Sequence, residues 1–248
     1  MRRGMVTTIA AATAAALAFG SSFAETDDDA AIANSLAAML RAGRTVVSRH
    51  QAEINDPNKG DKGFTGAKLL AEAKAIYKQT TGEDPDSVDA SSRRGKLLRL
   101  QMEAMSGVVD ANQATINEKG LAFKGFIPAT FGRLTDETFN RRAGGEARMK
   151  VTAPPDFIRN LKAEPDGWEL KVIKNDFLSP KWPKGKAYSE IVDENGRKAF
   201  RVAVPEYYVA SCLACHGGPK GDIDVTGYPK EGGAVGDLGG VISISLFR

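Results

Sequence analysis

Val241-Ile242-Ser243-Ile244-Ser245-Leu246-Phe247, near the C-terminal end, largely alternates apolar with small polar residues. A period of two places the two kinds of side chain on opposite faces of a β-strand, so residues 240–247 are predicted to form a half-buried strand. Short apolar runs bounded by turn residues predict four more strands upstream, at 148–153, 167–174, 186–192 and 198–205. Asp193-Glu194-Asn195-Gly196 is typical of a hairpin turn. The C-terminal half is therefore predicted to form a mainly antiparallel sheet.

The N-terminal half has a helical pattern instead. Between residues 29 and 55, apolar side chains and one histidine recur at three- and four-residue spacings: Leu36, Met39, Leu40, Val46, Val47, His50 and Ile54. Further helices are predicted over 68–80 and 94–117, the first of them ended by Gly82 and Pro85. Helices followed by an antiparallel sheet indicate the α+β class.

Two of these helical segments repeat each other at a constant offset of 62 positions. Val46-Val47 recurs as Val108-Val109, and Gln51-Ala52 recurs as Gln113-Ala114. The register continues from Lys62-Gly63-Phe64 to Lys124-Gly125-Phe126. An unbroken register predicts a duplicated helix-plus-loop unit packed side by side, and the alternative is a chance match among common residues.

Cys212-Leu213-Ala214-Cys215-His216 is a continuous C-x-x-C-H sequence, the attachment signature of c-type haem. Its two thiols can add across the two vinyl groups of haem, and the adjacent histidine can bind the iron as an axial ligand. The chain has only two cysteines, so none remains for a disulfide framework. The predicted site residues are Cys212, Cys215 and His216, and the predicted cofactor is one covalent haem c per chain.

Two other functions of this motif are a redox dithiol and a structural zinc site. A redox dithiol would not need the histidine and normally lies beside a βαβ pattern, which is not evident here. A structural zinc site needs four ligands, so it would have to recruit His50 or a carboxylate. Both readings explain the motif less completely than haem does.

The first 24 residues have the pattern of a secretory signal peptide. Arg2 and Arg3 precede an apolar run, and Ser22-Phe23-Ala24 offers small residues where cleavage is expected. The run is shorter than the roughly 20 apolar residues that a membrane-spanning helix needs, although an uncleaved anchor is the alternative. The segment holds two of the 34 Lys and Arg residues and none of the 31 Asp and Glu residues, so the mature chain is nearly neutral. We expect a soluble periplasmic protein without a nucleic-acid footprint.

Three segments together resemble a bacterial family of periplasmic single-haem c-type domains with a PAS-like fold. They are Lys124-Gly125-Phe126-Ile127-Pro128-Ala129-Thr130-Phe131, Cys212-Leu213-Ala214-Cys215-His216-Gly217-Gly218-Pro219 and Gly236-Asp237-Leu238-Gly239-Gly240-Val241-Ile242-Ser243. The resemblance covers roughly residue 94 to the C-terminus. It implies a five-stranded antiparallel sheet with long N-terminal helices packed against it and the haem between them. The expected division is a signal peptide over 1–24, a helical extension over 25–93 and the haem domain over 94–248.

The resemblance also points to Arg159 as a cofactor-binding residue. Family members often carry R-N-x-x-N-x-P before the sheet, whereas this chain reads Arg159-Asn160-Leu161-Lys162-Ala163-Glu164-Pro165 and lacks the second asparagine. Arg159 could meet a haem propionate, because a guanidinium binds a carboxylate in bidentate fashion. The alternative is a solvent-exposed arginine.

The distal iron ligand decides whether such a haem carries electrons or binds a gas. Some family members use a cysteine from an N-terminal helix, and this chain has none to spare. His50 is the first candidate as a second metal ligand, although a lone histidine on an apolar face is more often a packed core residue. Met105 and Met102 come next, although helical methionines usually serve packing. An open or water-occupied position is the remaining alternative.

Three functions follow from these observations. The first is a haem sensor that responds to redox state or a small gas ligand and signals to a separate periplasmic partner. The second is a monohaem electron carrier with a redox partner. The third, an enzyme such as a peroxidase, needs an open distal site and an acid-base histidine, so a non-enzymatic role is favoured. The amphipathic helices could also pair between two chains as a homodimer.

Overall fold

The computed structural model describes residues 18–248, with side chains from residue 28 onward. The predicted signal peptide therefore lies largely outside the described residues, apart from the backbone of 18–24, which belongs to the first helix. The helices are α1 (Ala18–Arg49), α2 (Gln51–Ile54), α3 (Gly66–Thr81), α4 (Arg93–Ala111), α5 (Gln113–Ile116), α6 (Pro128–Arg142), α7 (Gly167–Val172) and α8 (Leu213–His216). The strands are β1 (Ala147–Thr152), β2 (Tyr188–Glu194), β3 (Arg197–Tyr207) and β4 (Leu238–Phe247). No helix among the described residues has the length and apolarity to cross a bilayer.

The sheet is antiparallel throughout, in the order β1-β4-β3-β2. The α+β class is thus confirmed, while a fifth strand is not found among the described residues. Asn195 and Gly196 both have positive φ, 55° and 81°, as a two-residue hairpin turn between β2 and β3 requires. The predicted turn is therefore confirmed.

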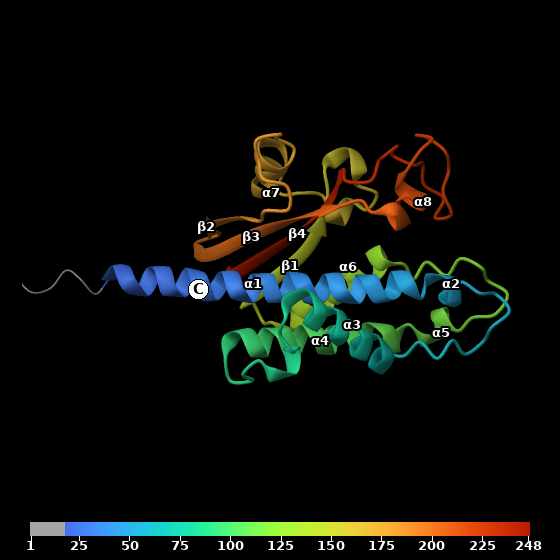
Figure 1. Cartoon of the computed structure of the whole chain (residues 1–248), viewed down its shortest axis with the longest axis horizontal. Helices are drawn as coiled ribbons and strands as arrows, with labels where there is room; N and C mark the ends of the chain where they lie inside the picture. Colours follow the sequence, from blue (N-terminus) through green and yellow to red (C-terminus); the bar gives the residue numbers. More distant parts are fainter. Residues whose placement is uncertain (1–17) are drawn as a thin grey trace, which may run out of the picture.

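Strand β4 is buried on both faces, which differs from the half-buried strand predicted from its alternation. Strand β4 lies between β1 and β3, and the long helices cover one face of the sheet while α7 lies on the other side (Figure 1). Ile242, Ile244 and Leu246 join the core on the face of the long helices. Val241 packs on the opposite face with Ile173 and other residues at α7. Ser243 and Ser245 are polar but buried.

The strand predicted over 167–174 is wrong, because these residues form α7 and continue into a π-helical turn, Ile173–Phe177. The reason is a capping box. The Asp166 carboxylate accepts from the Glu169 backbone N–H at 2.9 Å, and the Glu169 carboxylate accepts from the Asp166 N–H at 2.8 Å. Two of the unpaired donors at a helix start are satisfied in this way, which favours a helix over an extended segment.

The 62-residue repeat is borne out by reciprocal contacts between its two copies. The Gln51 side chain donates to Phe126 O at 3.3 Å, and Gln113 donates to Phe64 O at 2.9 Å. Each of these four residues has its counterpart at the offset of 62. The backbone N–H of Lys62 likewise donates to the Asn117 side chain, and that of Lys124 donates to Asn55. Each copy therefore fixes the loop of the other.

In the structure the repeat extends beyond the segments whose sequences match. Helix α6 begins at Pro128, at the same offset from the start of α3, in a region where no helix was predicted. Proline suits the first helical position because its missing N–H needs no partner there. The predicted helices 29–55 and 94–117 both break at equivalent residues, His50 and Asn112, where α2 and α5 begin. Of the three predicted helices, only the one over 68–80 forms a single uninterrupted element, α3.

Two apolar clusters hold the helical layer and the sheet together. One lies among the helices and includes Met39, Phe64 and Met105. The other joins Leu36 of α1 and Leu97 of α4 to the sheet. Both clusters draw on residues from each side of the expected boundary at 93/94. That boundary remains a prediction.

Gly95 in the first turn of α4 provides a test of this packing. A Cβ at Gly95 would lie 1.9 Å from the Asp89 carbonyl oxygen and 2.7 Å from its carbon. Gly95→Ala is therefore expected to lower the free energy of unfolding by about 1–3 kcal/mol in denaturant titrations, because backbone must move. Gly107→Ala in the same helix meets nothing within 4 Å and is the control. It should raise stability by up to ~1 kcal/mol, and equal effects of the two changes would contradict the packing described.

Candidate functional site

The C-x-x-C-H residues lie on a short turn of helix that follows β3. Cys212 ends a 3-10 turn and caps α8, which contains Cys215 and His216. Gly217 N–H donates to Leu213 O at 2.9 Å and ends this helix. Both cysteines are free thiols, and both are partly exposed. Burial raises the pKa of the Cys215 thiol, so the protonated form is favoured.

The His216 imidazole is held on two sides. Its Nδ1 lies 2.9 Å from a carboxylate oxygen of Glu231. The ring stacks on Tyr208, with centroids 5.1 Å apart and planes at 17°. Nε2 of His216 has no hydrogen bond to any residue that the structure describes. The nitrogen that remains available is therefore the one opposite the carboxylate.

Arg159 joins this group from a distant part of the chain. Its Nε and Nη2 donate to the two oxygens of Glu231 at 2.6 and 3.0 Å, and its Nη1 donates to Asp224 at 2.6 Å. Nη2 also donates to the Cys215 carbonyl at 2.9 Å. Burial alone would lower the pKa of Arg159, but the bonds to Glu231 and Asp224 hold it above its usual value. We call Arg159, His216, Asp224 and Glu231 the His216 network.

The alternative prediction of a solvent-exposed Arg159 is therefore wrong, because Arg159 lies beside the C-x-x-C-H motif and is largely buried. Each guanidinium nitrogen has a protein partner. A propionate would have to share these donors, so that role stays a prediction.

The glycine-rich loop before β4 closes over Tyr208. A Cβ at Gly239 would lie 2.3 Å from the Tyr208 ring, and one at Gly233 would lie 2.7 Å from it. Gly233 N–H also donates to the His216 carbonyl at 2.7 Å. Tyr208 is buried, yet its hydroxyl has no hydrogen-bond partner. The glycines are required because the ring and the motif lie directly against the loop backbone.

Large apolar side chains are exposed beside the motif. Val209, Ile223, Val225 and Val235 are each more than half exposed, and all four flank α8 or lie in the loop after it. Neighbouring exposed apolar residues on a protein surface commonly mark a binding site. Together with two free thiols, an imidazole whose Nε2 is unengaged and the unpartnered Tyr208 hydroxyl, they fit a large apolar group attached at this motif.

The structure does not bring His50 to the motif. His50 lies at the break between α1 and α2, where Nδ1 is 3.2 Å from Glu53 and Nε2 is 3.0 Å from Glu72. Its ring also packs on Phe64, 4.9 Å between centroids. Figure 1 places α2 at the end of the helical layer and α8 at the end of the sheet layer. Coordination of iron by His50 stays a prediction, and it would require the loss of a carboxylate contact.

The methionine candidates lie in the helical core. Met105 is fully buried, and its methyl group occupies the space that a Cβ at Gly43 would need. Met102 belongs to the same cluster. Both side chains therefore have packing roles, and their part as iron ligands stays a prediction.

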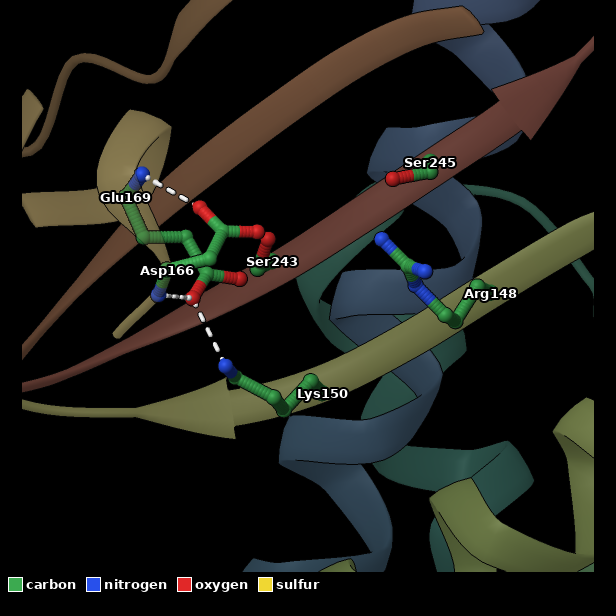
Figure 2. Close-up of a pocket in the computed structure, with 6 residues that line it drawn as sticks. All are labelled: Arg148, Lys150, Asp166, Glu169, Ser243 and Ser245. Carbon is green, nitrogen blue, oxygen red and sulfur yellow. Dashed lines mark hydrogen bonds and ion pairs between the residues drawn. The ribbon is translucent and has the colours of Figure 1, made fainter. Parts of the chain in front are cut away.

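A polar cavity of about 270 Å³ lies on the face of the sheet that points away from the long helices, between β1, β4 and α7 (Figure 2). It is lined by Arg148, Lys150, Asp166, Glu169, Ser243 and Ser245. Figure 2 shows Lys150 reaching from β1 to Glu169, 2.7 Å away. Asp166 pairs with Arg201 and Arg148 with Glu194. The charged residues that line the cavity are already paired with one another or with neighbouring side chains. We therefore interpret them as a polar network that holds α7 against the sheet.

A buried carboxyl group lies between α6 and the sheet. Asp136 of α6 is almost fully buried, and neither of its oxygens makes a close hydrogen bond. Burial raises its pKa to about 8, although the Arg44 cation and the Val151 backbone oppose this shift. Nε of Arg44 is also buried without a partner.

Sequence reasoning found the motif and Arg159 but missed Tyr208, Asp224 and Glu231. No local pattern marks them, since Glu231 lies fifteen positions after His216 and meets it only when the intervening loop has folded back. Among the side chains that the structure describes, from residue 28 onward, no three His, Cys, Asp or Glu residues converge as a metal-binding group.

Comparison with known proteins identifies a family. The family model described as Tll0287-like matches residues 31–246. No curated protein and no solved structure matches the chain. The matched region includes the helical repeat, the sheet and the C-x-x-C-H motif, so it extends well beyond the segment from residue 94 that the resemblance covered. The chain belongs to the Tll0287-like family.

Proposed function

We propose that this protein is a periplasmic monohaem c-type protein that acts in electron transfer or in redox or ligand sensing. The observation that carries the proposal is the C-x-x-C-H helix, with two free thiols and a histidine whose Nε2 is unengaged. Membership of the Tll0287-like family is compatible with it. The PAS-like character of the fold and the place of the haem beside the sheet belong to the proposal as well.

The residues present fit covalent haem c. Each cysteine would add its S–H across one vinyl group, which forms a thioether and requires no oxidant. Bound haem would supply a one-electron centre, or a site for a small gas when its distal position is free. The chain's own contribution is to hold His216 in one orientation through Glu231 and Tyr208. The apolar side chains beside α8 would limit the access of water.

His216→Ala tests the proximal role of this histidine. Loss of the imidazole is expected to shift the Soret band and weaken or remove the low-spin bands in the absorption spectrum, while covalent attachment through the cysteines persists. His50→Ala is the comparison, because both nitrogens of His50 face carboxylates. An unchanged spectrum for His216→Ala would show that another residue binds the iron.

Carbon monoxide distinguishes the two proposed roles. A Soret shift on adding CO to the reduced protein would mean an open or displaceable distal position and would favour ligand sensing. An unmoved spectrum would mean two firm axial ligands and would favour electron transfer. Variants at His50 and Met105 would then identify the second ligand.

A further inference from the structure

We propose that Glu231 is a positioning residue for the haem iron, which fixes the His216 ring through Nδ1 and lowers the midpoint potential of the iron. The inference rests on the proposed function, since it concerns the same histidine. It assigns a role to a residue that the C-x-x-C-H motif does not contain.

The geometry selects one nitrogen of His216 for the iron. Nδ1 and Glu231 are 2.9 Å apart, a normal hydrogen-bond length. A carboxylate can only accept a hydrogen bond, so this contact assigns the donor role to Nδ1 and leaves Nε2 as the nitrogen for the iron. Stacking on Tyr208 restrains rotation of the ring about this bond. A histidine ligand commonly has its second nitrogen fixed by a carboxylate or a carbonyl in this way.

Glu231 itself is held as a carboxylate. Its side chain is 9 % exposed and lies against the Arg159 guanidinium, which pairs with a carboxylate rather than with a neutral carboxyl group. Arg159 donates to both of its oxygens, so the carboxylate has little freedom to turn away. Asp224 in turn pairs with Nη1 of Arg159 and anchors the guanidinium.

The consequence follows from the charge of the acceptor. A carboxylate draws the Nδ1 proton more strongly than a neutral carbonyl does, so the ring becomes a stronger electron donor through Nε2. A stronger donor stabilises the ferric state relative to the ferrous state, because the ferric iron carries one more positive charge. The midpoint potential should therefore be lower than with a neutral acceptor at this position.

The experiment compares two variants of the haem-loaded protein that remove the same charge. Glu231→Gln keeps the size of the side chain and a neutral acceptor for Nδ1. Asp224→Asn removes a charge that contacts Arg159 and the Cys215 side chain but has no hydrogen bond to His216. Midpoint potentials come from redox titration, and the g values of the ferric state come from electron paramagnetic resonance.

Glu231→Gln is expected to raise the midpoint potential clearly more than Asp224→Asn, and of these two variants only Glu231→Gln should change the ferric g values. Glu231→Asp restores the charge at a shorter reach, so its potential should lie nearer the wild type. If Glu231→Gln does not mature, Glu231→Asp is compared with Asp224→Asn instead. Of these two variants, only Glu231→Asp alters the hydrogen bond to Nδ1, so only Glu231→Asp should change the ferric g values.

Equal shifts in Glu231→Gln and Asp224→Asn, with unchanged g values, would overturn the inference and leave only a general charge effect. Failure of the proposed function has a different signature. In that case the wild-type protein itself would carry no covalent haem, and no potential could be measured for any variant.

Discussion

The double variant Cys212→Ser, Cys215→Ser is expected to lose all covalently bound haem. The chain has only these two cysteines, so no other thiol can replace them. A serine hydroxyl is a far weaker nucleophile than a thiol and forms no comparable link to a vinyl group. The measurement is haem staining of the denatured protein after expression in a host that matures c-type cytochromes. The wild type should stain, and the double variant should not.

The single variants serve as the controls for this experiment. Cys212→Ser and Cys215→Ser each leave one thiol, so each should attach haem in reduced yield through one thioether. Haem that stays with the double variant through denaturation would contradict attachment at C-x-x-C-H. Loss of haem without any loss of folded protein would show that the effect is chemical rather than structural.

Asp136→Asn is expected to change how stability depends on pH. In the folded protein the pKa of Asp136 is raised from 3.8 to about 8. Between those values the unfolded chain has lost the proton while the folded chain keeps it, so this group makes the free energy of unfolding fall as pH rises. One proton corresponds to at most ~1.4 kcal/mol per pH unit. Asparagine does not titrate and removes this contribution.

The measurement is the difference in unfolding free energy between Asp136→Asn and the wild type, from denaturant titrations at several pH values. The unfolding free energy of Asp136→Asn minus that of the wild type should increase from about pH 4 to about pH 8 and stay constant above pH 8. The total increase should be at least ~1 kcal/mol. Glu137→Gln is the neighbouring control, because its ion pair with Arg133 is exposed and such pairs contribute little. A difference for Asp136→Asn that does not change with pH would contradict the buried, protonated carboxyl group.

The sequence predicted the parts of the fold that depend on local patterns. The antiparallel sheet follows from period-two alternation, and the Asn195-Gly196 turn follows from residues that tolerate positive φ. The repeat at an offset of 62 predicted two units packed side by side, and the reciprocal bonds of Gln51 and Gln113 join them. Carried one step further, the same offset would have predicted α6 from α3. The strands and the turn are encoded within a few neighbouring residues, whereas the repeat is visible because two segments of the chain share one pattern.

The error over 167–174 concerns a local signal, because the run is apolar enough for a strand but Asp166 and Glu169 form a capping box that makes it a helix. The other errors arose where distant contacts decide the outcome. The serines of β4 suggested a solvent-facing side, although α7 covers that side. In the site, C-x-x-C-H is contiguous and could be read directly. Glu231 and Tyr208 reach His216 only through the folded glycine-rich loop, so no spacing rule could reveal them.

The most direct test of the central claim is the absorption spectrum of the wild-type protein, denatured and reduced after maturation in a host with c-type haem assembly. We expect a haem spectrum that stays with the polypeptide through denaturation and solvent extraction, with one haem per chain. A polypeptide that loses all its haem on extraction, or that never acquires it, would contradict covalent haem attachment at C-x-x-C-H.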